Sequence, residues 1–391
     1  MKVLLFEPHL SNRGHTKEWC WSLYKLLNND IISKIIFLDF DDILKKTFKE
    51  KTMLETPYEI INISKTRSPQ ITSRGLKRIK QGENIKKWYS EIIKKINSLN
   101  SDLMIVSSQD TYFMYKEFKK INIKKIYTVH TVNFIPVLHK EKYKKRNLIR
   151  KFNGIKISNI IRKSINNDKL LVLEESTRDY LKKSGIKKTY SIPYISFSQK
   201  EINSDSEKGL IKNNRFIIPG MIYEGKNHDF VLNAINKNKN KFKNINIHIA
   251  GYPRKGYGTM IVEEAKKLKE FGVTGNFKYL SNNELREEIK LSKFVIIPYS
   301  KIRWDQTSGI MYDAIKNNRP IIVPDILPFK NYLKKYNFGL SYKENDYDSF
   351  INTLYKATET PIDIFIEEIK KFKLDNTTDK IKEKFKEILL E

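Results

Sequence analysis

The sequence is poor in the residues that build covalent or metal-linked frameworks. Cys20 is the only cysteine among the 391 residues, so no disulfide can form within the chain and no cluster of thiolates can bind a metal ion. No apolar run approaches the roughly 18 residues of a membrane span. The apolar start, Val3–Phe6, ends at Glu7 and is too short for a secretory signal. We therefore expect a cytoplasmic protein in a reducing compartment.

The phosphate-binding motifs of several enzyme classes are also missing. No GxGxxG follows an expected strand and no GxxxxGK[ST] occurs, which argues against nicotinamide chemistry and P-loop hydrolysis. The sequence has no helix-turn-helix, zinc-finger or RNA-recognition signature, and its Tyr and Trp residues do not alternate with basic ones in a stacking pattern. We therefore expect no nucleic acid partner.

What the chain has in excess is positive charge, with a formal net charge of +29. Residues 1–200 carry 41 Lys and Arg and 19 Asp and Glu, a net +22, whereas residues 201–391 carry a net +7. A general enrichment in Lys, Asn and Ile can explain part of this charge, but alone it would affect both halves alike. The asymmetry indicates a basic face on the N-terminal half.

Short apolar runs alternate with longer amphipathic segments in both halves. In the first half we predict strands at Lys2–Phe6, Lys34–Phe40, Leu103–Ser107, Ile126–His130 and Leu170–Leu173, and helices at Lys17–Leu27 and Asn84–Leu99. In the second half we predict strands at Arg215–Pro219, Ile245–Ala250, Asn276–Tyr279, Phe294–Pro298 and Pro320–Val323, and helices at His228–Asn236, Thr259–Phe271, Asn283–Leu291 and Asp375–Leu390. Such alternation is typical of parallel sheets covered by helices on both faces, so we expect an α/β fold.

A polar segment separates the two halves. Residues 197–213 contain Ser, Asn, Asp and Gly without periodicity, which is typical of a linker. At 391 residues the chain exceeds what one core usually supports. We predict two domains, 1–196 and 214–375, with a cleft between them, and a C-terminal helix over 376–391 that crosses back to the first domain.

The segment 305–325, DQTSGIMYDAIKNNRPIIVPD, is the most informative one. A turn of small residues, Thr307 to Gly309, precedes a short helix, and the N-terminus of a helix presents unpaired N–H groups that suit a phosphate. Asp305 precedes this turn, and Asp313 lies roughly 7.5 Å along the helix. The two acids can therefore contact the groups on either side of a diphosphate, and we predict the binding site of a sugar nucleotide here.

Three further residues follow or precede predicted strands. Lys226, in PGMIYEGKNHD, lies just ahead of a helix and can bring positive charge to a diphosphate, although a solvated surface lysine is the common alternative. His130 ends the strand IYTVH, where a neutral imidazole can bond a sugar hydroxyl, although most histidines are structural. Gly14 lies between the first strand and helix and can allow a phosphate or an acceptor to approach the backbone.

The segment 140–163, KEKYKKRNLIRKFNGIKISNIIRK, combines basic residues with Leu and Ile. On an anionic membrane it would combine apolar insertion with roughly 1 kcal/mol per basic residue near the surface. The alternative is a solvated helix whose apolar side faces its own core. The sequence alone favours neither interpretation.

Together these motifs resemble the retaining glycosyltransferases of the GT-B fold, in the large family 4 group. In that family two glutamates stand seven residues apart, ahead of a helix rich in small residues, and DQTSGIMYDAIKNNRPIIVPD has the same layout with aspartates. The segment PGMIYEGKNHDFVLNAI is similar to its strand-glycine-lysine loop, and YTVHT is similar to its strand that ends in histidine. INIHIAGYP and FKYLSNNELREEIKLSKFVIIPYS also resemble elements of its second domain.

The resemblance implies two Rossmann-like domains that face each other across a cleft, the first binding the acceptor and the second the nucleotide sugar. It also implies roles for individual residues: the donor sugar contacts Asp305, the transferred sugar bonds His130, the ribose is held by Asp313, and the diphosphate binds Lys226, Ser308 and Gly309. Where the family often has an arginine after the loop glycine, this chain has Met221. We suggest that Arg303 or Arg254 supplies the missing charge.

By this resemblance the protein is a metal-independent, retaining glycosyltransferase that needs no cofactor besides its donor. We expect the acceptor to be a saccharide, free or attached to a polyprenyl lipid, in surface polysaccharide biosynthesis, and the protein to lie on the inner face of the cell membrane. Two alternatives stay open: a sugar-nucleotide epimerase or inverting GT-B transferase, and a catalytically silent GT-B subunit that serves as a scaffold.

Overall fold

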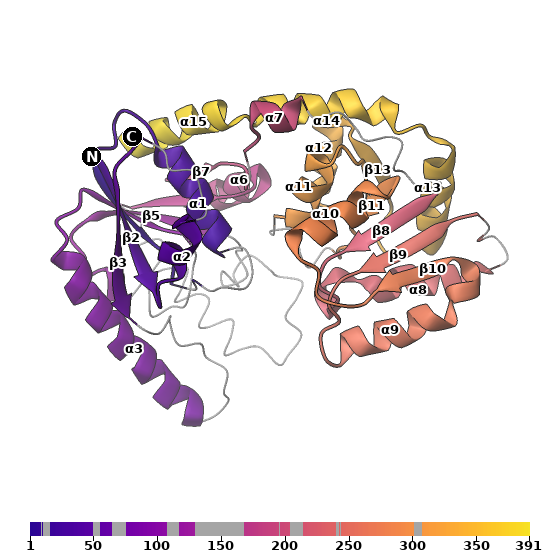
Figure 1. Cartoon of the computed structure of the whole chain (residues 1–391), viewed down its shortest axis with the longest axis horizontal. Helices are drawn as coiled ribbons and strands as arrows, with labels where there is room; N and C mark the ends of the chain where they lie inside the picture. Colours follow the sequence, from indigo (N-terminus) through magenta and orange to yellow (C-terminus); the bar gives the residue numbers. More distant parts are fainter. Residues whose placement is uncertain are drawn as a thin grey trace. The chain divides into compact units, whose positions relative to one another are not determined.

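The computed structural model of the chain describes residues 1–8, 10, 16–49, 55–64, 76–107, 117–129, 168–194, 196–203, 214–239, 242, 244–300 and 307–391. The chain divides into two compact units (Figure 1). The first unit comprises Met1–Tyr194 and Thr378–Glu391, and the second unit comprises Ile195–Thr377. Each unit is built on one sheet of parallel strands.

The first unit contains a seven-stranded sheet in the order β3-β2-β1-β4-β5-β6-β7. Its strands are β1 (Lys2–Phe6), β2 (Lys34–Phe40), β3 (Tyr58–Ser64), β4 (Leu103–Val106), β5 (Lys124–Val129), β6 (Lys169–Val172) and β7 (Thr189–Ser191). Its helices are α1 (Thr16–Leu27), α2 (Ile43–Lys49), α3 (Leu76–Asn97), α6 (Glu175–Lys183) and α15 (Thr378–Leu390).

The central strands of this sheet are mostly apolar, as expected of a parallel sheet with helices on both faces. All four residues of β4 are buried, and in β1 and β2 only the first residue is partly exposed. The last helix of the chain, α15, packs on α1, and Lys386 of α15 forms an ion pair of 2.6 Å with Asp30. The C-terminal residues thus belong to the first unit although they follow the second in sequence.

The second unit contains a six-stranded sheet in the order β10-β9-β8-β11-β12-β13. Its strands are β8 (Arg215–Pro219), β9 (Asn246–Ala250), β10 (Val273–Asn276), β11 (Phe294–Ile296), β12 (Ile321–Pro324) and β13 (Gly339–Tyr342). Its α-helices are α7 (Gln199–Ile202), α8 (His228–Lys237), α9 (Tyr257–Lys267), α10 (Asn282–Lys290), α11 (Gly309–Lys316), α12 (Phe329–Tyr336), α13 (Tyr347–Glu359) and α14 (Asp363–Asp375). Helix α8 packs against both α9 and α13, while α10 packs with α11 and α12 with α14 (Figure 1).

The chain order of this sheet places its switch point between β8 and β11. From β8 the chain proceeds outward through β9 to β10, then returns to β11 on the other side of β8 and proceeds outward through β12 to β13. In open parallel sheets, ligands bind beyond the carboxyl ends of the strands at such a point. A ligand site is therefore expected at the segments that follow β8 and β11.

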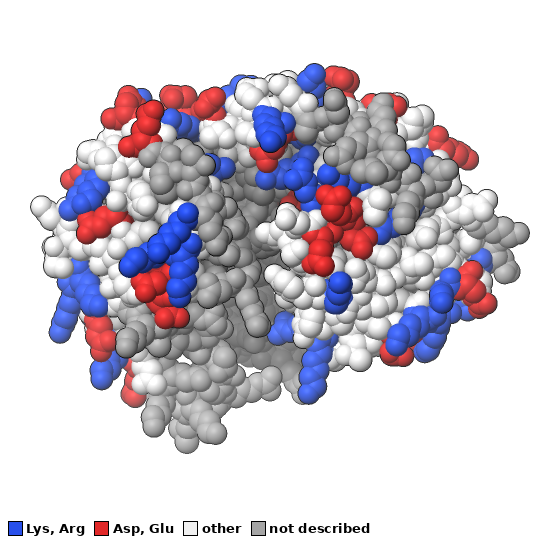
Figure 2. Space-filling model, in the orientation of Figure 1, with Lys and Arg blue, Asp and Glu red and all other residues white. Residues whose placement is uncertain are grey.

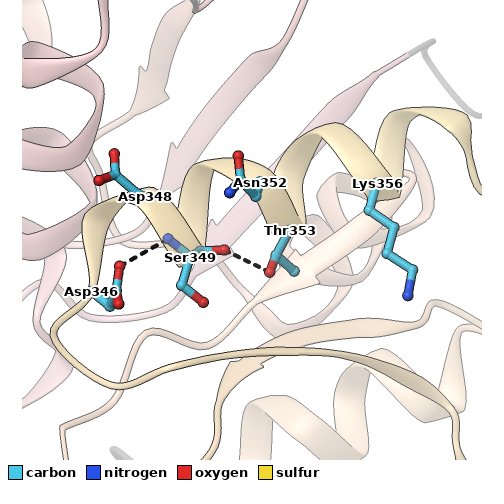
Figure 3. Close-up of a pocket in the computed structure, with 6 residues that line it drawn as sticks. All are labelled: Asp346, Asp348, Ser349, Asn352, Thr353 and Lys356. Carbon is cyan, nitrogen blue, oxygen red and sulfur yellow. Dashed lines mark hydrogen bonds between the residues drawn. The ribbon is translucent and has the colours of Figure 1, made fainter.

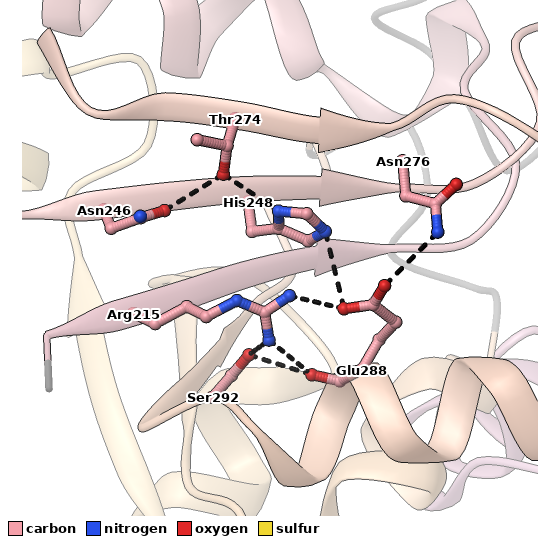
Figure 4. Close-up of polar contacts among 7 residues, drawn as sticks. All are labelled: Arg215, Asn246, His248, Thr274, Asn276, Glu288 and Ser292. Carbon is pink, nitrogen blue, oxygen red and sulfur yellow. Dashed lines mark hydrogen bonds and ion pairs between the residues drawn. The ribbon is translucent and has the colours of Figure 1, made fainter. Parts of the chain in front are cut away.

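A polar network joins α10 to the first three strands of the second unit (Figure 4). The guanidinium of Arg215 on β8 forms an ion pair with Glu288 on α10 and donates to Ser292 Oγ over 2.8 Å. Asn276 on β10 donates to the other oxygen of Glu288 over 3.3 Å, and His248 on β9 lies 3.5 Å from this carboxylate. These partners, most of all Arg215, hold the pKa of Glu288 below its usual value although burial opposes them.

Part of the predicted linker 197–213 is instead folded. Ser198 caps α7 with a capping box that includes Glu201, and Phe197 is buried and pairs with Thr377 as an isolated bridge. The periodicity of so short a helix is too weak to recognise in the sequence. Residues 204–213 lie outside the described residues.

Two other predicted elements, one in each unit, have different bounds in the structure. The strand predicted at Asn276–Tyr279 is β10, which ends at Asn276, because Gly272 ends the preceding 3-10 turn in the left-handed region and the strand starts directly after it. The helix predicted over Asp375–Leu390 is α15 alone, since α14 ends at Asp375 and Asn376 and Thr377 separate the two helices. The pairing of Thr377 with Phe197 accounts for this interruption.

Candidate functional site

Helix α11 begins beyond the carboxyl end of β11 with a side-chain cap. Ser308 is buried, and its Oγ accepts the backbone N–H of Met311 over 3.3 Å. In an α-helix the first N–H groups have no acceptor within the helix, and here those of Gly309 and Ile310 come first. The N-terminus of α11 therefore presents backbone donors and the positive end of the helix dipole.

Lys226 follows β8, on the other side of the switch point. It ends the 3-10 helix η3 (Glu224–Lys226), its side chain is buried, and its ammonium group donates to the carbonyl of Pro219 over 3.3 Å. Burial of an ammonium group requires acceptors or a counter-charge. This lysine is therefore a fixed part of the carboxyl edge of the sheet and not a solvated surface residue.

Lys226 and the first turn of α11 meet at Gly220, the residue after β8. A Cβ atom at Gly220 would lie 2.7 Å from Lys226 Nζ and 3.3 Å from Cδ1 of Ile310, and Gly220 has a φ of +92°. Gly251, the residue after β9, packs directly on Gly220, because a Cβ atom at Gly251 would lie only 2.1 Å from the carbonyl oxygen of Gly220. The absence of a side chain at Gly220 leaves room for the Lys226 ammonium group near the side chain of Ile310, in the first turn of α11. A cation beside the first turn of a helix is a combination that suits a phosphate.

Other residues predicted for the site lie on the same unit. Asp313 is half-buried on α11, four residues after Gly309, as the sequence predicted. Arg254 is exposed in the loop after β9, and its backbone N–H donates to the carbonyl of Ile222 over 3.0 Å, which attaches this loop to the segment that follows β8. Gly14, His130, Arg303 and Asp305 lie outside the described residues.

His228 was given no role by the sequence analysis and is the most unusual residue beside the site. It is the first residue of α8, fully buried, and no described residue hydrogen-bonds either of its ring nitrogens. Burial, and then the charge of Lys226, lower the pKa of His228 from 6.5 to about 3. The imidazole is therefore neutral at physiological pH. The sequence contains no signal for this, because KNHD resembles an ordinary polar helix start.

Tyr257 joins the start of α8 to the start of α9. Its hydroxyl donates to the Asp229 carboxylate over 2.6 Å and accepts the backbone N–H of Asp229 over 3.1 Å. Burial raises the pKa of this phenol, and the neighbouring carboxylate raises it further. The contact fixes the first turn of α8, which immediately follows Lys226.

Two hollows in the described part of the chain are lined by other residues. One, of about 530 Å³, lies along the start of α13, where Asp346 accepts the N–H of Ser349 and Thr353 donates to the Ser349 carbonyl (Figure 3). These groups satisfy one another within the helix, so we assign no site there. The other, of about 670 Å³, lies in the first unit, where Lys125 and Asp168 form a buried ion pair of 3.5 Å.

The described residues contain neither a metal-binding cluster nor a helix that could span a membrane. Within the described ranges, no group of three or more His, Cys, Asp or Glu side chains is arranged to bind a metal ion. None of the described helices combines the length and apolar character needed to cross a bilayer. On the face shown in Figure 2, basic and acidic side chains are mixed over both units. The basic segment 140–163 lies outside the described residues.

Comparison with solved structures identifies the fold class. A glycosyltransferase from Rickettsia africae matches with a TM-score of 0.66 at 15% identity over 99% of this chain and 98% of that one. HepE from Anabaena in complex with UDP matches with a TM-score of 0.65 at 11% identity over 100% and 99%. WaaG, a glycosyltransferase involved in lipopolysaccharide biosynthesis, matches with a TM-score of 0.64 at 11% identity over 98% of each chain. The chain therefore has the predicted GT-B fold.

The sequence of the second unit matches a family model. Residues 200–373 match the family model of the glycosyl transferases group 1, a range that contains Lys226, α11 and the whole six-stranded sheet. With the fold of the full chain, this match supports the group 1 glycosyltransferases as the family of this chain. A comparison with curated protein sequences gave no match.

Proposed function

We propose that the protein transfers a sugar from a nucleotide-sugar donor to a saccharide acceptor, with retention of the anomeric configuration and without a metal ion. The observation that supports this most directly is the convergence of the Lys226 ammonium and the N-terminus of α11 beside Gly220. These groups lie on either side of the switch point of the sheet, where a diphosphate would be bound by both.

The chemistry follows from the charge that develops during transfer. Cleavage of the sugar–phosphate bond leaves a nucleoside diphosphate with an additional negative charge. A buried ammonium and a helix N-terminus stabilise this charge more in the transition state than in the ground state, and one such donor is worth about 3 to 4 kcal/mol. In this proposal Lys226 and α11 together provide the charge neutralisation that a metal ion provides in other transferases.

We assign the remaining roles by the resemblance to the family 4 glycosyltransferases. Asp305 contacts the donor sugar, Asp313 binds the ribose and His130 bonds a hydroxyl of the transferred sugar. For retention, the acceptor attacks on the face from which the diphosphate leaves, and a phosphate oxygen accepts the acceptor's proton as the new bond forms.

Two more assignments complete the site. Arg254 or Arg303 adds positive charge where Met221 replaces the family's arginine, and Gly14 allows the acceptor to approach the first unit. The backbone contact between Arg254 and Ile222 supports Arg254 for this role, since it holds the loop after β9 against the segment after β8.

The comparisons suggest the setting of the reaction. HepE was solved with UDP bound, and WaaG is involved in lipopolysaccharide biosynthesis. We propose a nucleoside diphosphate sugar as donor and a surface polysaccharide, or its polyprenyl-linked precursor, as acceptor. The protein would then work in the cytoplasm on the inner face of the membrane, with the basic segment 140–163 against anionic lipid.

The first experiment is a thermal-shift screen with UDP, GDP, ADP and their sugars. A ligand at 100 times its dissociation constant adds about 2.7 kcal/mol of stability, which is readily detected. Lys226→Ala should remove the shift, whereas Lys255→Ala, which changes an exposed lysine of the same unit, should not. If no nucleotide shifts the wild type, or if Lys226→Ala binds as well as the wild type, the proposed donor site is wrong.

The second experiment tests the reaction. We expect slow hydrolysis of the donor that gives the largest shift, unaffected by EDTA, and a transfer product whose anomeric configuration, measured by NMR, equals that of the donor. An inverted product would identify an inverting transferase, epimerised donor would identify an epimerase, and complete inertness towards a bound donor would identify a scaffold subunit.

A further inference from the structure

The C-terminal end of α11, opposite the proposed diphosphate site, is held by two buried cations. The first is Arg319, which is fully buried and donates to the carbonyls of Lys290, Asn317 and Asn318 over 2.7 to 3.3 Å. It thereby binds the turn that follows α11 to the end of α10. A cation at this end of a helix also interacts favourably with the helix dipole.

The second cation, Lys373, is on α14 and is 0% exposed. Its ammonium group donates to Asn318 Oδ1 over 2.7 Å, to the carbonyl of Glu201 over 2.8 Å and to the carbonyl of Lys316 over 3.5 Å. One side chain therefore connects α14, α7 and the last turn of α11. A lysine side chain is almost never fully buried unless its ammonium group has such partners.

The charges around Lys373 are also specific. Glu201 forms an ion pair of 2.8 Å with Lys316, the last residue of α11, so that α7 and α11 are joined a second time. Burial lowers the pKa of Lys373 to about 8, the charge of Glu201 opposes this effect, and the charge of Lys316 adds to it.

Aromatic contacts hold the middle of α11 to the same elements. Tyr312 of α11 lies between Phe197, just before α7, and Phe372 of α14, with ring centroids 6.5 Å and 6.0 Å away. Phe197 also pairs with Thr377. The segments by which the chain enters and leaves the second unit are therefore packed directly on α11.

We propose that Lys373 is a positioning residue of the donor site: it fixes the C-terminal end of α11 against α7 and α14, and thereby fixes where the N-terminal end of α11 meets the diphosphate. This inference rests on the proposed function. It concerns a residue that would not contact the substrate.

The length of α11 explains why one end affects the other. The helix has eight residues, about 12 Å at 1.5 Å per residue, and so behaves as a rigid rod over this distance. A displacement of its last turn would therefore move its first turn relative to Lys226, which is held separately by its contact with Pro219. Misplacement of binding groups by as little as about 1 Å can be costly.

The test compares nucleotide affinity in four proteins by calorimetry, with UDP, GDP and ADP as separate probes. For the nucleotide that the wild type binds, Lys373→Met should lower the affinity by about 3- to 30-fold. Lys373→Arg should recover part of this loss. The matched control is Lys293→Met. Lys293 is a half-buried lysine that holds the end of another helix, because its ammonium group donates to the Thr358 carbonyl of α13 over 2.6 Å; no described bond joins this ammonium group to α11.

The pH dependence separates positioning from a general effect on stability. Because the pKa of Lys373 is about 8 in the folded protein and near 10.5 when unfolded, the folded state binds fewer protons between these values. Lys373 therefore makes the protein more stable as pH rises through this window. Its charge-assisted bonds to α11 weaken over the same window, so nucleotide affinity should fall. A purely structural lysine would not make affinity and stability change in opposite directions.

The outcomes are distinguishable. We expect the affinity of the wild type to fall between pH 7 and 9.5 and that of Lys373→Met to stay level. If Lys373→Met binds the nucleotide as tightly as the wild type, or if its affinity changes with pH as that of the wild type does, this inference is refuted. The proposed function would not be affected by either result. If Lys373→Met does not fold, the same pH comparison with Lys373→Arg, whose guanidinium stays protonated, decides the question. Failure of the wild type to bind any of the three nucleotides would refute the proposed function as well.

Discussion

The buried imidazole of His228 predicts that acid destabilises the second unit. Its pKa is about 3 in the folded protein and 6.5 in the unfolded chain, so between these values the unfolded state binds more protons. The stabilisation that comes from keeping the ring neutral is complete above pH 6.5 and is lost as the pH falls towards 3. With 1.36 kcal/mol per pKa unit, the whole loss is about 5 kcal/mol, and about 2 kcal/mol of it has occurred by pH 5.

The assay compares the wild type with His228→Leu by denaturant unfolding at pH 7.5 and pH 5. At pH 7.5 we expect the variant to be at least as stable as the wild type, because leucine removes two buried ring nitrogens that no described residue hydrogen-bonds. At pH 5 the difference in unfolding free energy between the variant and the wild type should be about 2 kcal/mol more in favour of the variant than at pH 7.5.

A control on the same helix separates titration from packing. Val231→Ala removes buried apolar atoms of α8 and no titrating group, so its cost should be the same at both pH values. An NMR titration of the imidazole protons gives an independent measurement. The reasoning is refuted if His228 titrates near 6.5, or if the stability difference between wild type and His228→Leu does not change with pH.

Three further predictions concern the second unit. Gly220→Ala should weaken nucleotide binding, because the new methyl group lies 2.7 Å from Lys226 Nζ on a backbone of positive φ; calorimetry that gives unchanged affinity would contradict this. Ser308→Ala should cost about 1 kcal/mol of unfolding free energy by removing the cap of α11, and denaturant titration should detect this loss. Arg215→Leu should cost about 3 to 5 kcal/mol because it leaves Glu288 without its main partner, and adding Glu288→Leu should recover part of that cost; additive losses would argue against the ion pair.

The fold of this chain could largely be predicted because its strands are continuous apolar runs between polar segments. Strands such as Lys2–Phe6 and Arg215–Pro219 are confirmed with the predicted bounds. Strand β3 was missed because Tyr58–Ser64 contains polar residues among its apolar ones, and β13 because Gly339–Tyr342 (GLSY) is only partly apolar and partly exposed. Helix α14 was missed because its apolar residues face two different neighbours, which blurs the period of the sequence.

The candidate site could be predicted only where it follows a strand in the sequence. Lys226 and Ser308 were predicted because each follows an apolar run that ends in a turn. Lys373 and His228 were not, because their burial depends on elements distant in the sequence, and in a chain with 74 Lys and Arg one more lysine carries no signal. What distinguishes Lys373 is its position on α14 against α7 and the end of α11, which no local pattern contains.

The bridge between Phe197 and Thr377 has a consequence for how such proteins can be recombined. Because it places the first and last segments of the second unit side by side, that unit has adjacent ends, like an insertion within a host domain. Such an arrangement allows the unit to be exchanged for the equivalent part of a relative through two nearby junctions. Chimeras made in this way would show whether sugar selection can be transplanted independently of acceptor selection.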